Sequence, residues 1–533
     1  MKSRKPNWNI SFVGQKPGWI ERASSVAIVA LAVLSMPMLA VQSAHAQETV
    51  LWSFCIQGPC VNGDAPYSSL TPDGAGNFYG TTYTGGDDYQ GVSAGGILFE
   101  LSPNGTGGYT ENVLYDFCSL PSCADGANPA YNNLIFDSMG NLYGTTLDGG
   151  AYGYGSVFEL SPEPADGCPS GSVSGNGWCE SVLHSFNANG VDGYYPYTGV
   201  IWDAQGNLYG ATSQGPSNGS VYELSPNGSG GWNEQVIYND YITYTTLAID
   251  SKGNIYGVDA NSNLFELSPN GSGGWNANNI YTFCDKKNDG CGPYQGPVFD
   301  SAGNLYGTTE YGGTKGYGTV WKLTPGKKGT WTEKVLHSFT NGKDGAYPFA
   351  TPTLDSSGNI YGTTTVGGPN IRGTVFELAV SGTTYKEKIL FSFNDTDGDY
   401  PVASLLLDGG NLYGTTEFGG YSIGASNCNC GAVFEVNPSS TATTTTLSAS
   451  PNPSTSGETV TFTAVVTPAP PDGETINFME GSSVLGTGSL TAGSATFMIS
   501  TLPVGTSKID AVYRGDLNFT TSTSNTVKQV VKN

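Results

Sequence analysis

The residues best suited to bind a ligand are tyrosines and aspartates in glycine-rich segments. An aromatic ring covers the apolar face of a sugar, and neighbouring carboxylates and amides hydrogen-bond to its hydroxyl groups. We therefore take twelve residues of these segments as candidates for a binding surface: Tyr83, Asp87, Asp88, Tyr89, Tyr152, Tyr154, Tyr194, Tyr195, Tyr311, Tyr317, Tyr347 and Tyr421. The sequence leaves open the alternative that these tyrosines only pack the loops around them.

No arrangement of residues indicates a catalytic centre. There is no GxSxG motif, and His184 and His337 stand in two equivalent "VLHSF" segments. At one equivalent strand position, six repeats carry a glutamate and the fifth carries Lys322. The six glutamates are Glu100, Glu159, Glu223, Glu266, Glu377 and Glu435. A glycosidase needs two carboxyl groups flanking its substrate, whereas a residue that recurs with a repeat is more simply part of the scaffold. We predict no catalytic residues and no cofactor, and leave enzymatic activity open.

A metal site is not indicated either. One aspartate precedes a tight turn in each repeat, and a calcium site would need several oxygens to converge on one ion. Each aspartate is expected to cap its own turn instead: Asp73, Asp137, Asp203, Asp250, Asp300, Asp355 and Asp408.

The ten cysteines fall into near neighbours along the chain. In an oxidising compartment such pairs indicate disulfides that close single loops. The expected pairs are Cys55 with Cys60, Cys118 with Cys123, Cys168 with Cys179, Cys284 with Cys291, and Cys428 with Cys430.

The N-terminus has the pattern of an export signal. Basic residues precede an apolar run at 25–41, and small residues at Ala44 and Ala46 predict cleavage before Gln47. Removing residues 1–46 takes away five cations and one anion, so the formal net charge changes from −24 to −28. Such acidity argues against a nucleic-acid partner, whose phosphates need basic patches.

A sequence motif recurs along most of the remaining chain. Gly-Asn-(Phe/Leu/Ile)-Tyr-Gly occurs seven times, with Asn at 77, 141, 207, 254, 304, 359 and 411. These spacings suit four-stranded propeller blades with loop insertions. Each copy contains an apolar strand ending in Asp, a tight turn, "NLYGTT" or a variant, a "VFEL" strand and a "VLYDF" type strand, which we call strands A, B, C and D. A tyrosine present in every copy is expected to be structural.

The order of strands predicts how the repeats close. A D-type strand, "TVLWSF" at 49–54, precedes the first A strand, and the seventh repeat ends on a C-type strand, "AVFEV" at 432–436. Pairing these two segments would remove two exposed sheet edges. The prediction is an all-β protein: a seven-bladed β-propeller closed by an N-terminal outer strand.

The recurrent "GNLYGTT..GG...G.VFEL.P", with "DG..P" between blades, resembles the bacterial tandem-repeat family called GloVer. The resemblance covers residues 48–438 and implies an exported protein, but it brings no catalytic residues. The fourth copy departs from it, because "GNIYGVDANSN" lacks the Thr-Thr and Gly-Gly pairs.

A second domain follows a Ser/Thr-rich linker at 439–446. Residues 447–533 contain several short alternating segments and no cysteine, which predicts a small β-sandwich. "GETVTFTA" and "AVYRGDLNFTTSTS" resemble bacterial Ig-like repeat domains, which act as spacers or adhesive modules. The expected domains are thus a signal peptide (1–46), a propeller (47–438), the linker (439–446) and an Ig-like sandwich (447–533).

The function these features favour is non-catalytic binding by a secreted or cell-surface protein. In propellers the D-to-A and B-to-C loops emerge on one face, so that face should carry the candidate tyrosines. We expect a monomer without an integral membrane segment after signal cleavage, whose partner is an extracellular glycan or surface protein. The alternatives are a secreted hydrolase or lyase acting on polysaccharide, and a structural component of the cell envelope.

Overall fold

The computed structural model describes residues 48–55, 60–86, 95–105, 108–131, 133–242, 244–420, 430–439, 441, 443–470, 472–481, 483–515, 519–520 and 522–533. The predicted signal peptide lies outside these residues. Within them the regular elements are β-strands apart from two single 3₁₀ turns, η1 (Pro121–Cys123) and η2 (Lys327–Gly329). None of the described elements is an apolar helix of bilayer-spanning length. The all-β class is therefore confirmed.

Seven antiparallel sheets repeat the strand order A-B-C-D along the described chain. The A strands are β2 (Thr71–Pro72), β6 (Ile135–Phe136), β11 (Ile201–Trp202), β15 (Ala248–Ile249), β20 (Val298–Phe299), β25 (Thr353–Leu354) and β29 (Leu406–Asp408). The B strands are β3 (Phe78–Thr81), β7 (Leu142–Thr146), β12 (Leu208–Thr212), β16 (Ile255–Val258), β21 (Leu305–Thr309), β26 (Ile360–Thr364) and β30 (Asn411–Thr416). The C strands are β4 (Ile97–Pro103), β8 (Ser156–Pro162), β13 (Ser220–Pro226), β17 (Asn263–Pro269), β23 (Thr319–Pro325), β27 (Thr374–Ser381) and β31 (Ala432–Val436).

The D strands end six sheets in sequence order: β5 (Tyr109–Asp116), β10 (Trp178–Ser185), β14 (Trp232–Asn239), β18 (Trp275–Thr282), β24 (Trp331–Ser338) and β28 (Thr384–Ser392). A short strand, β9 (Val173–Gly175), extends the second sheet, and β19 (Gly290–Cys291) pairs with β22 (Tyr311–Gly312) as a separate ribbon.

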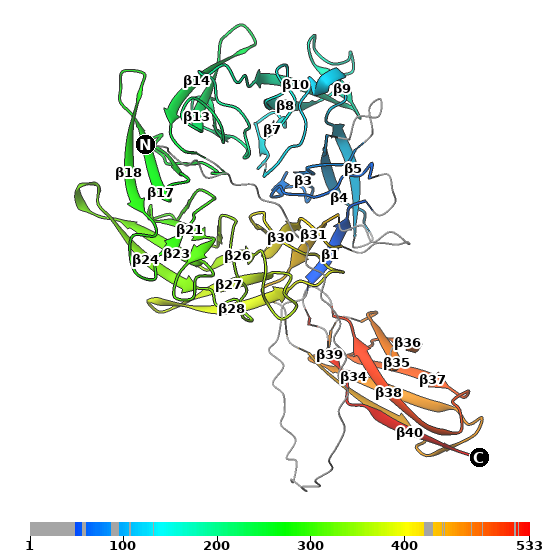
Figure 1. The fold of residues 1–533 in the computed structure, drawn as a ribbon. Helices are drawn as coiled ribbons and strands as arrows, with labels where there is room; N and C mark the ends of the chain where they lie inside the picture. Colours follow the sequence, from blue (N-terminus) through cyan, green and yellow to red (C-terminus); the bar gives the residue numbers. More distant parts are fainter. Residues whose placement is uncertain are drawn as a thin grey trace, which may run out of the picture. The chain divides into compact units, whose positions relative to one another are not determined.

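The seventh sheet takes its D strand from the start of the described chain. Strand β1 (Glu48–Ser53) pairs antiparallel with β31, with Glu48 opposite Val436 and Ser53 opposite Ala432. Figure 1 shows β1, drawn in blue, beside β31, drawn in orange-yellow. The predicted pairing of these two segments is confirmed.

The repeated "YG" pair has a packing reason in each sheet. In the fifth sheet a Cβ atom on Gly307 would lie 2.3 Å from Trp321 Cζ2, because the aromatic side chain of the C strand covers the glycine of the B strand. The preceding Tyr306 is 4% exposed. Glycine and tyrosine recur here because every sheet packs its B strand against its C strand in the same way.

The apolar core is divided among the contacts between sheets. Seven clusters of buried side chains each combine residues of two sheets that follow one another along the chain. One of them joins the last sheet to the first, with Tyr413 and Val433 packed together with Phe54, Phe78 and Phe99. The core therefore holds each sheet against a neighbour on either side.

Residues 444–533 form a second, separate core. Its strands are β32 (Thr444–Ser450), β33 (Ser454–Thr455), β34 (Val460–Thr467), β35 (Thr475–Glu480), β36 (Ser483–Ser489), β37 (Ser494–Ile499), β38 (Gly505–Tyr513), β39 (Ser522–Thr523) and β40 (Val527–Lys532). They make two sheets around a cluster that includes Phe462, Phe478, Ile509 and Tyr513. This is the sandwich expected from the alternating sequence.

Candidate functional site

The D-to-A loops hold the residue before the recurrent proline in an unusual backbone conformation. Tyr195, Tyr347 and Tyr400 have φ values of 59°, 57° and 60°. This left-handed region is costly for bulky residues, and the position before proline disfavours it further. The turn is fixed by backbone hydrogen bonds: Tyr195 N donates to Tyr154 O at 2.9 Å, and Ser213 N donates to Tyr195 O at 3.0 Å. Each such residue thus joins the B-to-C loops of two neighbouring sheets.

Five tyrosines line a cavity between the loops of the second, third and fourth sheets. We call it the tyrosine cavity: Tyr154, Tyr194, Tyr195, Tyr197 and Tyr244, with Ala188, Ser213 and Gln214, around about 500 Å³. The ring centroids of Tyr154, Tyr194 and Tyr195 lie 5.3–5.8 Å from one another at steep angles. Three of the predicted site residues therefore come together at one cavity, which also offers the Gln214 amide at its edge.

Four further aromatic side chains gather beside this cavity, in contact with Tyr197 and Tyr244. We call the six together the central aromatic cluster: Tyr67, Tyr131, Tyr197, Tyr244, Tyr294 and Phe349. The Tyr131 ring contacts rings from three other loops, at 5.2 Å to Tyr67, 6.4 Å to Tyr244 and 5.4 Å to Phe349. The loops leading into the first, second, fourth and sixth sheets thus meet at one point.

Sequence reasoning missed the central aromatic cluster, although a signal was present. An aromatic residue follows the loop proline by one position at Tyr67, Tyr197, Tyr294 and Phe349, and by two at Tyr131. A fixed offset from a turn residue predicts an equivalent position in the four repeats that carry it.

Buried carboxyl groups adjoin the central aromatic cluster. Glu417 is 9% exposed and accepts a hydrogen bond from the Tyr67 hydroxyl at 2.9 Å. Burial raises the pKa of Glu417 to about 7, and it also raises the pKa of Glu310. Asp399 is paired with the Arg372 guanidinium at 2.7 Å. The same loops therefore combine aromatic rings with carboxyl groups, of which Glu417 can be protonated near neutral pH.

The other predicted tyrosines occupy different places. Tyr311 and Tyr317 both contact the Tyr347 ring, at 5.6 and 5.7 Å, and repeat the Tyr154 and Tyr195 arrangement three sheets further along the chain. Tyr83 packs against Tyr67. Tyr152 is 57% exposed. Asp87, Asp88, Tyr89 and Tyr421 lie outside the described residues.

The two histidines lie at junctions between sheets. His184 Nε2 is 3.3 Å from Asp192 Oδ2, and Glu234 of the next D strand faces the same aspartate. Burial raises the pKa of Glu234 to about 7; Asp192 adds to this rise and His184 opposes it. His337 and Asp344 repeat the pair at 3.6 Å. Recurrence at equivalent junctions indicates a structural contact, as expected from the repeated "VLHSF" segments.

Five glutamates of the D strands share a further property. An Oε1 atom without a hydrogen-bond partner is buried in each of Glu111, Glu180, Glu234, Glu333 and Glu387. Burial raises the pKa of Glu111 to about 8. Burial also raises the pKa of Glu180 to about 9, with a smaller contribution from the nearby Asp125 carboxylate. A protonated carboxyl avoids the cost of a buried, unpaired charge.

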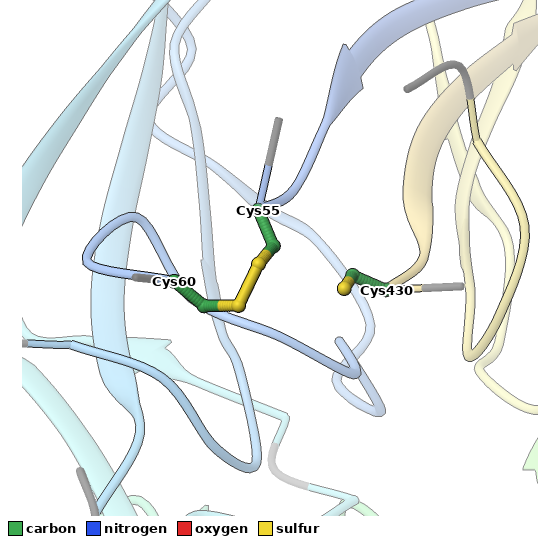
Figure 2. A group of neighbouring side chains, drawn as sticks. All are labelled: Cys55, Cys60 and Cys430. Atoms are coloured by element: carbon green, nitrogen blue, oxygen red, sulfur yellow. A yellow bond between two sulfur atoms is a disulfide. The ribbon is translucent and has the colours of Figure 1, made fainter. Parts of the chain in front are cut away.

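Four of the predicted disulfides are present: Cys55–Cys60, Cys118–Cys123, Cys168–Cys179 and Cys284–Cys291. The predicted partner of Cys430, Cys428, lies outside the described residues. Figure 2 shows Cys430 beside the Cys55–Cys60 bond, with the three sulfur atoms within 4.8 Å of one another. Since Cys430 is also disulfide-bonded, this group has no thiolate to offer a metal ion.

The turn aspartates behave as predicted in six sheets. In the second sheet Asp137 Oδ1 accepts hydrogen bonds from the backbone of Met139 and Asn141, at 2.8 and 2.9 Å, and Asp137 Oδ2 accepts one from Asn141 Nδ2. Asp73, Asp203, Asp250, Asp300 and Asp355 cap their turns in the same way. Each carboxylate is occupied by its own turn.

The comparisons agree with the resemblances drawn from the sequence. The Gloeobacter/Verrucomicrobia repeat matches residues 40–264 and 243–467, and the bacterial Ig-like domain (group 3) matches residues 447–532. No curated protein matches the chain.

Similar solved structures are remote in sequence. The extracellular domain of a putative one component system from B. thetaiotaomicron is 12% identical, with a TM-score of 0.46. That match covers 92% of this chain, which spans 59% of the other. A protein of unknown function from Bacteroides thetaiotaomicron is 13% identical, with a TM-score of 0.34. That match covers 69% of this chain and 89% of the other chain.

Proposed function

The chain belongs to the Gloeobacter/Verrucomicrobia repeat family, and we propose that it is an exported, non-catalytic protein that binds carbohydrate. In this proposal its seven sheets are the blades of a closed propeller and the loop face with the tyrosine cavity takes the ligand. The observation that carries the proposal is the convergence of Tyr154, Tyr194, Tyr195, Tyr197 and Tyr244 on one cavity.

Contacts across the junction of the last and first sheets support a closed ring. Ala65 N donates to Cys430 O at 3.0 Å, as Tyr195 N does to Tyr154 O between the second and third sheets. Thr415 Oγ1 donates to Ser68 O at 2.9 Å. Because this junction repeats the contacts of the others, a ring of seven blades accounts for it without a special element.

The chemistry of the tyrosine cavity suits a sugar. Rings set at steep angles present both faces and edges, so a pyranose can stack on one tyrosine while its hydroxyl groups reach the phenols and the Gln214 amide.

Export is supported by four disulfides, because such bonds persist in oxidising compartments. The Ig-like domain then serves as a spacer or attachment. Release from the cell and retention at its surface are both compatible with this role.

A glycan array with residues 47–533 tests the proposal. We expect binding that is lost in Tyr195→Asn and kept in Tyr347→Asn. Both variants place asparagine at a left-handed position before proline, as the chain itself does at Asn128 with φ 57°. Of the two, only Tyr195 lines the tyrosine cavity.

The same polysaccharides are then assayed for new reducing ends and unsaturated products. Binding to no glycan, or equal binding by Tyr195→Asn, would overturn the carbohydrate proposal. Turnover of a polysaccharide would favour the enzyme alternative instead.

A further inference from the structure

The fifth sheet departs from the charge pattern of the others. Its C strand carries Lys322 where the other six sheets carry glutamate. Lys334 of β24 lies directly opposite Lys322 in the strand register. Like charges directly opposite each other destabilise a strand pair. None of the other six sheets has such a pair at this position; Glu223, for example, faces Gln235.

The two lysines line a second cavity. We call it the lysine cavity: it has about 610 Å³ and lies between the β23–β24 and β27–β28 hairpins. Its lining includes Lys322, Lys334, Thr332, Thr384 and Tyr385, but no aspartate or glutamate. These residues lie near the C-to-D turns. The B-to-C loops, which form the tyrosine cavity, lie at the other ends of the C strands.

Each ammonium group is held in place while keeping donors free. Lys322 Nζ lies 3.8 Å from Asp300 Oδ2 and 4.9 Å from the centre of the Tyr306 ring. Lys334 Nζ donates to Thr383 O at 3.2 Å. An ammonium has three donors, so each lysine retains hydrogens for a ligand.

We propose that the lysine cavity binds a small sugar carrying one carboxylate, such as a uronic acid. The Lys322 and Lys334 ammonium groups would attract the carboxylate, while threonine hydroxyls and the Tyr385 ring contact the sugar. A cavity of this size suits a mono- or disaccharide. A highly charged polyanion fits less well, because the chain carries a formal net charge of −24, or −28 without residues 1–46. The proposal concerns a second site and stands independently of the tyrosine cavity.

Calorimetric titration of residues 47–533 with D-glucuronate, glucose, acetate and inorganic sulfate tests the assignment. At low ionic strength we expect glucuronate to bind at least about tenfold more tightly than the other three probes, and salt to weaken its binding. No binding of glucuronate, or equal binding of glucose, would overturn the proposal. Acetate or sulfate binding as tightly as glucuronate would contradict the sugar assignment.

Two variants locate the binding. Lys322→Glu restores the residue of the other six sheets, so the fold should tolerate it, and glucuronate affinity should fall at least about tenfold. Lys334→Gln, which copies Gln235 of the third sheet, should weaken binding in the same direction. Lys327→Glu, on the exposed η2 turn outside the cavity, makes the same charge change and should leave binding unaltered.

Unchanged affinity in Lys322→Glu and Lys334→Gln would overturn the proposal. Tyr195→Asn should not alter glucuronate binding, so the failure of one site is distinguishable from the failure of the other. Circular dichroism and thermal unfolding of each variant establish that the fold is kept.

Discussion

Replacing Glu180 by glutamine should change how the stability of the protein depends on pH. The Glu180 side chain is 1% exposed, and its Oε1 has no hydrogen-bond partner. Burial, with a smaller contribution from the Asp125 carboxylate, raises the pKa of Glu180 from its ordinary value of 4.5 to about 9. The folded protein therefore keeps a proton that the unfolded chain releases above pH 4.5.

The sign and size of the effect follow from this difference. A raised pKa in the folded state contributes stability that is complete below the unfolded value and is lost as pH rises toward the folded value. Each pH unit inside this window costs about 1.4 kcal/mol per group, so Glu180 alone should cost about 3 kcal/mol between pH 5 and pH 7. Glutamine has no proton to lose. The free energy of unfolding of Glu180→Gln, relative to the parent, should therefore rise by about 2 to 3 kcal/mol over that range.

Urea unfolding followed by tryptophan fluorescence at pH 5, 6 and 7 measures this difference. Glu163→Gln is the control, because Glu163 lies beside the C strand of the same sheet, its side chain is partly exposed and its carboxylate accepts a hydrogen bond from Ser174 Oγ at 2.9 Å. Parallel pH profiles for the parent and Glu180→Gln would refute the reasoning, because Glu180 would then be ionised in the folded protein at neutral pH.

Three further predictions concern the scaffold. Tyr195→Asn and Tyr347→Asn should each stabilise the fold by about 1 kcal/mol, because asparagine tolerates a left-handed φ better than tyrosine. Chemical unfolding measures the change in stability. Destabilisation by both variants would show that the left-handed φ of these tyrosines costs little. Deleting residues 48–53 should lower the thermal midpoint of unfolding and promote self-association, because β31 becomes an exposed sheet edge. Calorimetry measures the midpoint and size exclusion the association. A monomer with an unchanged midpoint would count against closure by β1. Replacing Cys168 and Cys179 by alanine should lower the free energy of unfolding by about 3 kcal/mol, the loop-closure value for a sequence separation of 11 residues. An unchanged free energy of unfolding would show that this disulfide does not stabilise the fold.

Features that repeat could be predicted from the sequence. The β1–β31 pairing follows from an orphan D strand at one end and a missing one at the other. The capping by Asp137 follows from an aspartate placed before a tight turn. Such contacts are local, or recur in every sheet, so their signal accumulates over copies.

Features that depend on meetings between distant loops could not be predicted. Tyr154 and Tyr195 belong to different repeats, and only the packing of neighbouring sheets brings them to one cavity. The contact of Tyr131 with Tyr244 and Phe349 depends on the whole arrangement of loops. For Lys322, the sequence revealed the break in the charge pattern, but not the opposing Lys334 or the cavity that both line.

The most direct test of the carbohydrate-binding account is a crystal structure of residues 47–533 soaked with the best glycan from the array. The account predicts a sugar ring stacked in the tyrosine cavity, in contact with Tyr154, Tyr195 and Tyr244. A sugar bound only elsewhere, or an empty cavity at a saturating concentration of a ligand that binds in solution, would contradict it.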